Sequence, residues 1–249
     1  MRHFIHSGDL GDVIYSLPTV KAMGGGVMHL IDVPGMTAHG MTLERAKLIE
    51  SLLKAQPYIQ RVEFGGRLGT DEGDSIVDLN TFRYMPRDLC NEWLPNHYLD
   101  VHHVHRSAAY EPWLTVDGLG CPTGVLIARS ARYHNPRFPW RRVVEQYRDY
   151  AMFIGTPVEH AAFNLEFDAD LPHLLTDDLL EVAEAINACT LFVGNQSCPL
   201  AIAEGLKVPV ICEVCPYCPN CISPRADFWA GRDEHLILPD LENLNALCQ

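Results

Sequence analysis

Residues 1–20 read MRHFIHSGDLGDVIYSLPTV and carry, in order, the patterns of a strand, a glycine turn and a helix. The first six residues predict a short strand, GDLGD at 8–12 predicts a tight turn, and the apolar positions from residue 13 predict a helix. Such a helix start offers unpaired backbone N–H groups and a positive dipole end to an anion. Because glycine lets a ligand approach the backbone closely, we expect Gly8 and Gly11 to border a binding site.

Asp12 lies at the end of this turn, close to the place where an anion would be favoured. A carboxylate at a helix start can cap the helix by accepting hydrogen bonds from backbone N–H groups. It can also take a proton from a substrate hydroxyl as a general base. The residue pattern by itself favours capping, and both roles stay open at this point.

The chain has 249 residues, enough for one large domain or two small ones. With 47% hydrophobic and 20% charged residues, it has the composition of an ordinary globular protein. No run reaches the roughly 18 apolar residues of a membrane span, and no signal pattern is present, so we expect a cytoplasmic protein without a transmembrane segment. A formal net charge of −13 argues against nucleic acid as a partner, because polyphosphate is bound by Lys and Arg.

Strand and helix patterns alternate along the chain, with one interruption rich in Pro and Gly at 111–124 and a segment without clear period, expected to form broken helices, at 81–110. The predicted strands are residues 27–33, 61–64, 75–79, 125–128, 151–154, 191–193 and 208–214. The predicted helices are residues 42–55 with Thr42 as cap, 140–149, 176–187 with Thr176 as cap, a short helix after 194–197, and 241–247. Two such runs predict two α/β units with mainly parallel sheets. Since ligands bind at the C-terminal ends of parallel strands, we expect the site in the cleft between the units.

Three segments resemble one known family: GDLGDVIYSLP at 8–18, GTPVEH at 155–160, and INACTLFVGNQSCPLAIAEGLKVPV at 186–210. They are similar to glycosyltransferase family 9, the ADP-heptose:lipopolysaccharide heptosyltransferases, and they occur in the family's order. The resemblance implies a GT-B fold, in which two Rossmann-like, doubly wound domains face a cleft. It implies an acceptor-side domain at 1–115 and a nucleotide-sugar-binding domain at 116–249.

The resemblance also implies an activity, the metal-independent transfer of a sugar from a nucleoside-diphosphate sugar to an acceptor hydroxyl, without a cofactor. The acceptor would be a saccharide or a glycolipid. The family's proposed catalytic base falls on Asp12, so the resemblance favours a base over a cap at this position. Such a reaction needs a group to take the acceptor proton, together with positive charge and N–H donors for the departing diphosphate.

Several further residues are expected to bind the donor. Arg137, in Arg-Phe-Pro, matches the basic residue of the family's K-x-W-P-like stretch, and Arg129 and Arg132 lie on the same loop. Glu159 is placed like an acidic residue that meets the nucleoside, and Asn195, Gln196 and Ser197 form a strand-to-helix turn suited to phosphate. The arginines could instead be ordinary surface charges.

The departures from the family motif concern the donor. Gln196 stands where the family has an aspartate, Cys198 where it has a second glycine, and Ala201 where it has a histidine. These positions are expected near the donor phosphate and sugar. We therefore expect a donor other than ADP-heptose.

Four cysteines follow the spacing Cys212-x-x-Cys215-x-x-Cys218-x-x-Cys221, which resembles a zinc or iron–sulfur loop. Cys212 falls inside an apolar strand, however, and spacing without context is a weak signal, so we expect no metal here. Other functions stay open: an epimerase-like sugar-nucleotide enzyme of the same fold, a DNA-modifying glycosyltransferase, or a non-catalytic nucleotide-sugar-binding module. Turnover of a donor, with or without acceptor, would separate them.

Overall fold

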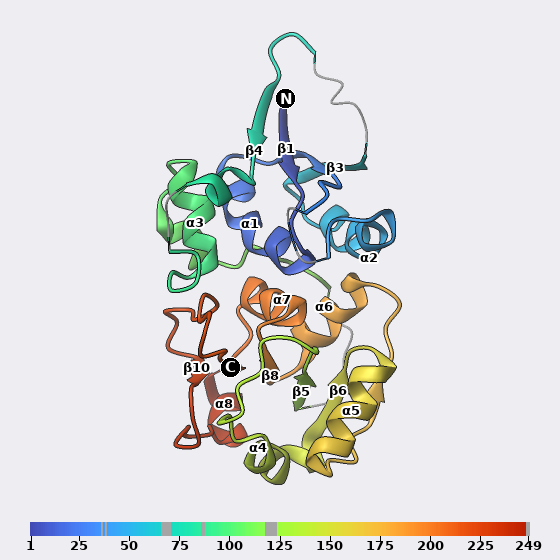
Figure 1. The fold of residues 1–249 in the computed structure, drawn as a ribbon, viewed down its shortest axis with the longest axis vertical. Helices are drawn as coiled ribbons and strands as arrows, with labels where there is room; N and C mark the ends of the chain where they lie inside the picture. Colours follow the sequence, from blue (N-terminus) through green and yellow to red (C-terminus); the bar gives the residue numbers. More distant parts are fainter. Residues whose placement is uncertain (36, 38, 66–70, 86–87, 118–123, 248–249) are drawn as a thin grey trace.

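The computed structural model describes residues 1–249 apart from 36, 38, 66–70, 86–87, 118–123 and 248–249. It consists of two α/β halves stacked along the long axis of the molecule (Figure 1). The first half runs from blue to green and the second from green to red. Each half is built on a sheet whose strand pairs are all parallel in the described residues. The predicted α/β class with mainly parallel sheets is therefore confirmed.

The sheet of the first half has the strand order β3-β2-β1-β4. Its strands are β1 (Arg2–His6), β2 (Gly26–Leu30), β3 (Ile59–Phe64) and β4 (Ser75–Asp78). Its helices are α1 (Leu10–Ala22), α2 (Leu43–Lys54) and α3 (Leu94–Val101), with the short 3₁₀ helices η1 (Thr81–Tyr84) and η2 (Arg106–Ala109). The expected broken helices between residues 81 and 110 are thus η1, α3 and η2.

The sheet of the second half has the order β10-β9-β8-β5-β6-β7. Its strands are β5 (Val125–Ala128), β6 (Ala151–Ile154), β7 (His173–Leu174), β8 (Leu191–Asn195), β9 (Val210–Glu213) and β10 (Phe228–Gly231). Its helices are α4 (Trp140–Tyr147), α5 (Pro157–Phe167), α6 (Leu179–Ala188), α7 (Cys198–Leu206) and α8 (Leu241–Leu247), with the 3₁₀ turn η3 (Arg148–Tyr150).

Each sheet has one switch point, a pair of neighbouring strands on either side of which the chain adds later strands in opposite directions. In the first sheet the strands after β1 are added on one side, and β4 then pairs with the other edge of β1. In the second sheet the same happens between β5 and β8. Crevices at the C-terminal ends of the strands at such switch points are the usual ligand sites of open α/β sheets.

The two halves share a hydrophobic core. Helix α1 contacts α7, and α2 contacts α6. Val13, Ile14 and Leu17 of α1 are fully buried, and their cluster continues to Leu200 and Ile202 of α7. Helix α1 is buried nearly all round, with α3 and η2 of its own half and α7 of the other half packed against it. Gly11 lies at this contact, where a Cβ would be 3.6 Å from the Cys198 Cα, within ordinary van der Waals distance.

Three local predictions need correction. Helix α1 already begins at Leu10, so Gly11 and Asp12 lie in its first turn and the preceding turn is shorter than expected. Helix α6 is capped by Asp178, whose side chain accepts from the N–H groups of Leu180 and Glu181, and not by Thr176. Helix α5 was not expected at all, although Thr156 and Glu159 form a capping box at its start. None of the helices in the described part of the chain is long and apolar enough to cross a lipid bilayer.

Candidate active site

A cleft of about 250 Å³ lies between the two halves. The first half contributes the start of α1 and the segment around η1, and the second half contributes the loop after β5, the start of α7 and residues near 220. Of the residues expected in the site, four have side chains or Cα atoms on the cleft wall together with Asp12: Gly11, Arg132, Gln196 and Ser197. The site therefore combines residues that follow the switch points of both sheets.

Asp12 carries its carboxylate on the first turn of α1, at the cleft wall. It forms an ion pair with Arg83, which follows β4 and stacks its guanidinium 4.8 Å from the Phe82 ring centre. Burial raises the pKa of Asp12, and the Arg83 charge works against that rise. Asp12 is therefore more basic than an exposed aspartate, while the neighbouring Arg83 charge favours its ionised form.

His6 fixes the backbone that leads into this helix. Its Nδ1 accepts a hydrogen bond from the Gly8 N–H at 2.9 Å, and its Nε2 lies 3.1 Å from the Tyr98 hydroxyl. Burial and the Arg83 charge lower the pKa of His6 to about 3. The imidazole therefore stays neutral at physiological pH, and it holds Gly8 in place behind the cleft wall.

Asp9 connects the two halves across the cleft. Its Oδ1 lies 3.5 Å from the Arg45 guanidinium and accepts from the Thr37 hydroxyl at 3.2 Å. Its Oδ2 pairs with Arg132 of the second half at 3.3 Å. Arg132 is thus placed at the cleft by an acidic residue of the opposite wall.

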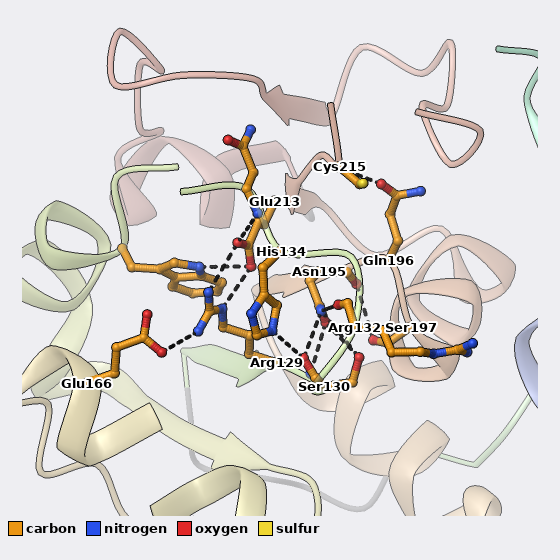
Figure 2. Close-up of polar contacts among 12 residues, drawn as sticks. Arg129, Ser130, Arg132, His134, Glu166, Asn195, Gln196, Ser197, Glu213 and Cys215 are labelled. Atoms are coloured by element: carbon orange, nitrogen blue, oxygen red, sulfur yellow. Dashed lines mark hydrogen bonds and ion pairs between the residues drawn. The ribbon is translucent and has the colours of Figure 1, made fainter. Parts of the chain in front are cut away.

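The loop that carries Arg132 is held by Asn195, the last residue of β8 (Figure 2). Asn195 Oδ1 accepts from the Ser130 N–H at 3.0 Å, and Asn195 Nδ2 donates to the carbonyl groups of Ser130 and Arg132. Asn195 is fully buried and lies behind the cleft wall. Its role in this structure is to position the loop, because both ends of its amide group are occupied.

Arg129 and Arg132 point in opposite directions (Figure 2). The Arg129 side chain is 8% exposed and pairs with the fully buried Glu213 at 2.9 Å and with Glu166 at 2.7 Å. Glu213 also accepts from the Trp140 indole N–H at 2.9 Å. Arg129 therefore ties the second half together and is not part of the cleft wall.

Arg137 and Glu159 also lie away from the cleft wall. Arg137 is 62% exposed and pairs with Glu234 at 3.2 Å. Glu159 accepts from the Thr156 backbone N–H at 2.9 Å, as the second member of the capping box of α5. The structure therefore brings Arg132 to the cleft and keeps Arg137, Arg129 and Glu159 in other contacts.

Both the oxygen and the nitrogen of the Gln196 side-chain amide form hydrogen bonds to the cysteine-containing loop at 215–220. Its Oε1 accepts from the Cys215 N–H at 2.7 Å, and its Nε2 donates to the Cys218 carbonyl at 2.7 Å and to Asn220 Oδ1 at 3.2 Å. Asn220 in turn is bonded to Leu89 and Leu94 of the first half. An aspartate could not donate these bonds, so the departure at this position has a structural reason.

The four cysteines of the spaced run are free thiols. The Cys212 and Cys221 sulfur atoms lie 3.6 Å apart in the core, and the Cys218 thiol contacts Cys90 of the first half. In the part of the chain that the structure describes, no three His, Cys, Asp or Glu side chains are grouped as metal ligands.

The cleft residues that were not expected from the sequence include Asp9, Arg83, Tyr133 and Asn220. Asp9 could have been found, because it lies in the same turn as Asp12. Arg83 and Asn220 come from segments without a clear period, and their approach to the cleft depends on how the chain returns across the two halves. Tyr133 lies between Arg132 and Arg137 on the loop after β5, and no charge or motif in the sequence distinguishes it from a surface tyrosine.

No family model and no curated protein sequence matches the chain. Among solved structures, a family 9 glycosyltransferase from Veillonella parvula DSM 2008 is similar with a TM-score of 0.60 and 12% identity, over 91% of this chain and 84% of that one. The E. coli ADP-heptose lps heptosyltransferase II is similar with a TM-score of 0.56 and 14% identity, over 99% and 98%. The iron-containing dodecameric glycosyltransferase TibC from enterotoxigenic E. coli H10407 has a TM-score of 0.56 and 13% identity, over 92% and 62%.

At these identities the likeness shows the fold. It is the GT-B arrangement, with two Rossmann-like halves facing a cleft, as the sequence resemblance implied.

Proposed function

We propose that this chain transfers a sugar from a nucleoside-diphosphate sugar to an acceptor hydroxyl, with Asp12 as the general base. The observation that carries the proposal is the partly buried Asp12 carboxylate, paired with Arg83 on the cleft wall opposite Arg132 and the start of α7. In the reaction, Asp12 takes the proton of the acceptor hydroxyl as the hydroxyl oxygen attacks the anomeric carbon. The bond from that carbon to the diphosphate oxygen breaks, and the nucleoside diphosphate leaves.

The donor diphosphate would lie against the second half. Arg132 supplies positive charge there, and because Asp9 also pairs with Arg45, Arg132 can turn to a phosphate while Asp9 keeps a partner. The Ser197 hydroxyl donates to the Asn195 carbonyl and does not cap α7, so the helix start at Cys198 on the cleft wall keeps its backbone N–H groups, apart from Pro199, for an anion. Asn195 supports the site indirectly, through the loop that it holds.

The proposal is tested by Asp12→Asn. The variant should keep its fold and its affinity for the donor, while turnover falls about 10²-fold or more, as expected for the loss of a general base. Turnover is followed with a panel of UDP-, GDP-, dTDP- and ADP-sugars, as transfer to saccharide acceptors or as hydrolysis of the donor. Donor binding is followed by the rise in melting temperature that a ligand of the folded state produces.

Asp9→Asn is the matched control, because it removes a second carboxylate from the same cleft. It should change donor affinity through Arg132 while turnover at saturating donor falls much less than in Asp12→Asn. Near-normal turnover of Asp12→Asn would remove Asp12 from the mechanism. Nucleotide-sugar binding without any turnover in the wild type would favour the non-catalytic binding module.

The identity of the donor is a separate part of the proposal. The E. coli neighbour is named for ADP-heptose. In this chain Gln196 is committed to the loop at 215–220, and Ala201 is fully buried beneath Gly11, so neither presents the family's aspartate or imidazole to a sugar. A site with different polar groups selects a different set of hydroxyls, so we expect another nucleotide sugar to be the better donor. A preference for ADP-heptose of about 10-fold or more in kcat/KM would contradict this expectation.

Three further points belong to the same proposal: a saccharide or glycolipid acceptor, a reaction that needs no metal ion, and a cytoplasmic location. The free thiols of the described cysteines support a reducing compartment. Because one structural neighbour is described as iron-containing, the metal is best measured directly. About one iron or zinc per chain in elemental analysis of active protein, with activity lost on chelation, would overturn metal independence.

A further inference from the structure

Tyr133 has an uncommon backbone for its residue type. Its φ angle is +59°, in the left-handed region that bulky side chains seldom adopt. The other non-glycine residues with positive φ in the described chain are His103, Asp168, Asp170 and Lys207, and all of them lie at or just after a helix end, where this conformation is common. Tyr133 instead lies in the loop between β5 and α4, on the wall of the cleft.

The loop is anchored on both sides of Tyr133. Before it, the Arg132 carbonyl accepts from Asn195, and after it, His134 Nε2 lies 2.6 Å from the Ser130 carbonyl oxygen. The Asn135 N–H donates to the buried Glu213 at 2.7 Å. A residue in a sparsely populated conformation persists when its surroundings over-determine it, and such residues gather at functional sites.

The surroundings of the ring indicate what it would contact. Tyr133 is 40% exposed although it lines the cleft, and the Arg132 guanidinium lies 5.2 Å from its ring centre. Burial is the main cause that raises the pKa of the Tyr133 phenol, and the Asp12 and Asp9 carboxylates add to the rise. The ring therefore lines the same cleft as the Asp12 carboxylate, which would act as base.

We propose that Tyr133 is the sugar-contact residue of the donor site, with its ring packed against the C–H face of the transferred sugar beside Asp12. This inference rests on the proposed function and deepens it. A phosphate would be bound by Arg132, whereas an apolar ring surface suits the C–H face of a sugar, and the neighbouring carboxylates suit its hydroxyls. The strained backbone is then the means by which the loop directs this ring into the cleft.

The test separates the sugar from the nucleotide. Dissociation constants are measured by calorimetry for ADP, UDP, GDP and dTDP, for their glucose conjugates, and for ADP-heptose. The ratio of the diphosphate Kd to the nucleotide-sugar Kd gives the contribution of the sugar, and the pair with the largest ratio is used for the variants. In Tyr133→Gly this ratio should fall close to 1, while the Kd of the diphosphate changes less than about 2-fold. Tyr133→Phe, which keeps the ring, should retain most of the ratio.

Asp168→Gly is the matched control, because Asp168 also has positive φ but lies at the end of α5, away from the cleft wall. Both glycine variants remove a left-handed residue with a side chain, so each should keep its melting temperature or raise it by about 2 °C. Only Tyr133→Gly should lose the sugar ratio.

An unchanged ratio in Tyr133→Gly, an equal weakening of diphosphate and nucleotide sugar, or a wild-type ratio near 1 for every sugar would overturn the inference. Each of these results leaves nucleotide binding in place. If the wild type binds none of the diphosphates, the proposed function fails with it.

Discussion

Asn80 and Asn195 stand at matching places in the two halves, one at the switch point of each sheet. Asn80 follows β4 and its Oδ1 accepts from both the N–H and the hydroxyl of Ser7, at 3.0 and 2.9 Å. Asn195 ends β8 and its Oδ1 accepts from both the N–H and the hydroxyl of Ser130, at 3.0 and 3.3 Å. The same amide thus joins the ends of two neighbouring strands in each half.

The two switch points differ in what they support. Ser7 is followed by Asp9, the N-cap residue of α1, and by Asp12 in the first turn of that helix, and Arg83 of η1 pairs with Asp12. Behind Ser130 comes a longer loop, and there Asn195 also binds the Arg132 carbonyl. The first half presents two carboxylates, one of them paired with Arg83, and the second half presents Arg132 and Tyr133. One structural device therefore positions different side chains on facing walls, and the comparison can be tested by removing each amide in turn.

The largest effect should come from Arg129, which supports the second switch point from behind. Arg129→Ala leaves Glu213 buried without its cation, so unfolding free energy should fall by about 3–5 kcal/mol in urea denaturation. Arg137→Ala, on the same loop but exposed, should leave stability nearly unchanged. Equal losses in the two variants would mean that Arg129 does not support the loop.

The asparagines themselves allow a direct comparison. Asn195→Ala should cost about 2–3 kcal/mol of unfolding free energy, because it removes bonds to Ser130 and to Arg132. Asn80→Ala should cost about 1–2 kcal/mol, because Ser7 loses its acceptor, whereas the second partner of the amide, Asp78, is exposed and can bond to water instead. Double-mutant cycles with Ser130→Ala and Ser7→Ala measure each coupling in isolation. A larger cost at Asn80 would reverse the comparison.

Helices α1 and α7, which follow the two switch points, pack against each other, and α7 carries the buried Glu204. It is fully buried, accepts from the Trp93 indole at 3.0 Å, and burial raises its pKa to about 8 from an ordinary value of 4.5. Between these pH values the native state binds more protons than the unfolded state, so stability is greatest below pH 4.5 and falls as pH rises.

Lys207 acts in the opposite direction, since burial lowers its pKa to about 7 and stability should rise with pH from there towards 10.5. The clear window is therefore pH 4.5 to 7. Glu204→Gln should abolish the decline in this window and stabilise the protein by about 2 kcal/mol at pH 7. Melting temperatures measured across this pH window follow the decline in stability. If stability falls with pH as steeply in Glu204→Gln as in the wild type, Glu204 is not the cause.

The smallest effect concerns which arginine meets the donor. Arg132→Ala should weaken the binding of a nucleoside diphosphate about 10-fold by calorimetry, because a charge-assisted contact is lost, and Arg132→Lys should restore part of it. Arg137→Ala is the control and should bind normally, given its place in an exposed pair with Glu234. The reverse result would return the diphosphate to Arg137, as the family pattern implies.

The fold was largely predictable because its signals are local. Apolar runs marked most strands, and Thr42 marked the start of α2 through a cap that the structure contains. The site was less predictable because it depends on partners distant in sequence. Arg129, Arg132 and Arg137 are equivalent in charge and share a loop, and only Glu213, Asp9 and Glu234 direct them to three different places. In the same way, the sequence does not show whether the Gln196 amide faces a ligand or the protein, and only the structure shows that it accepts from the Cys215 N–H.

The contacts of Asn220 have a consequence for how this cleft would take up a small molecule. Asn220 is bonded to Gln196 on one wall and to Leu89 and Leu94 on the other, so protein contacts fix the width of the cleft at this side. Ligand binding therefore does not have to include the unfavourable entropy change of ordering the two walls. Stiff inhibitors shaped to span Arg132 and Asp12 should therefore lose little affinity to induced fit, and loosening Asn220 should penalise them more than flexible ones.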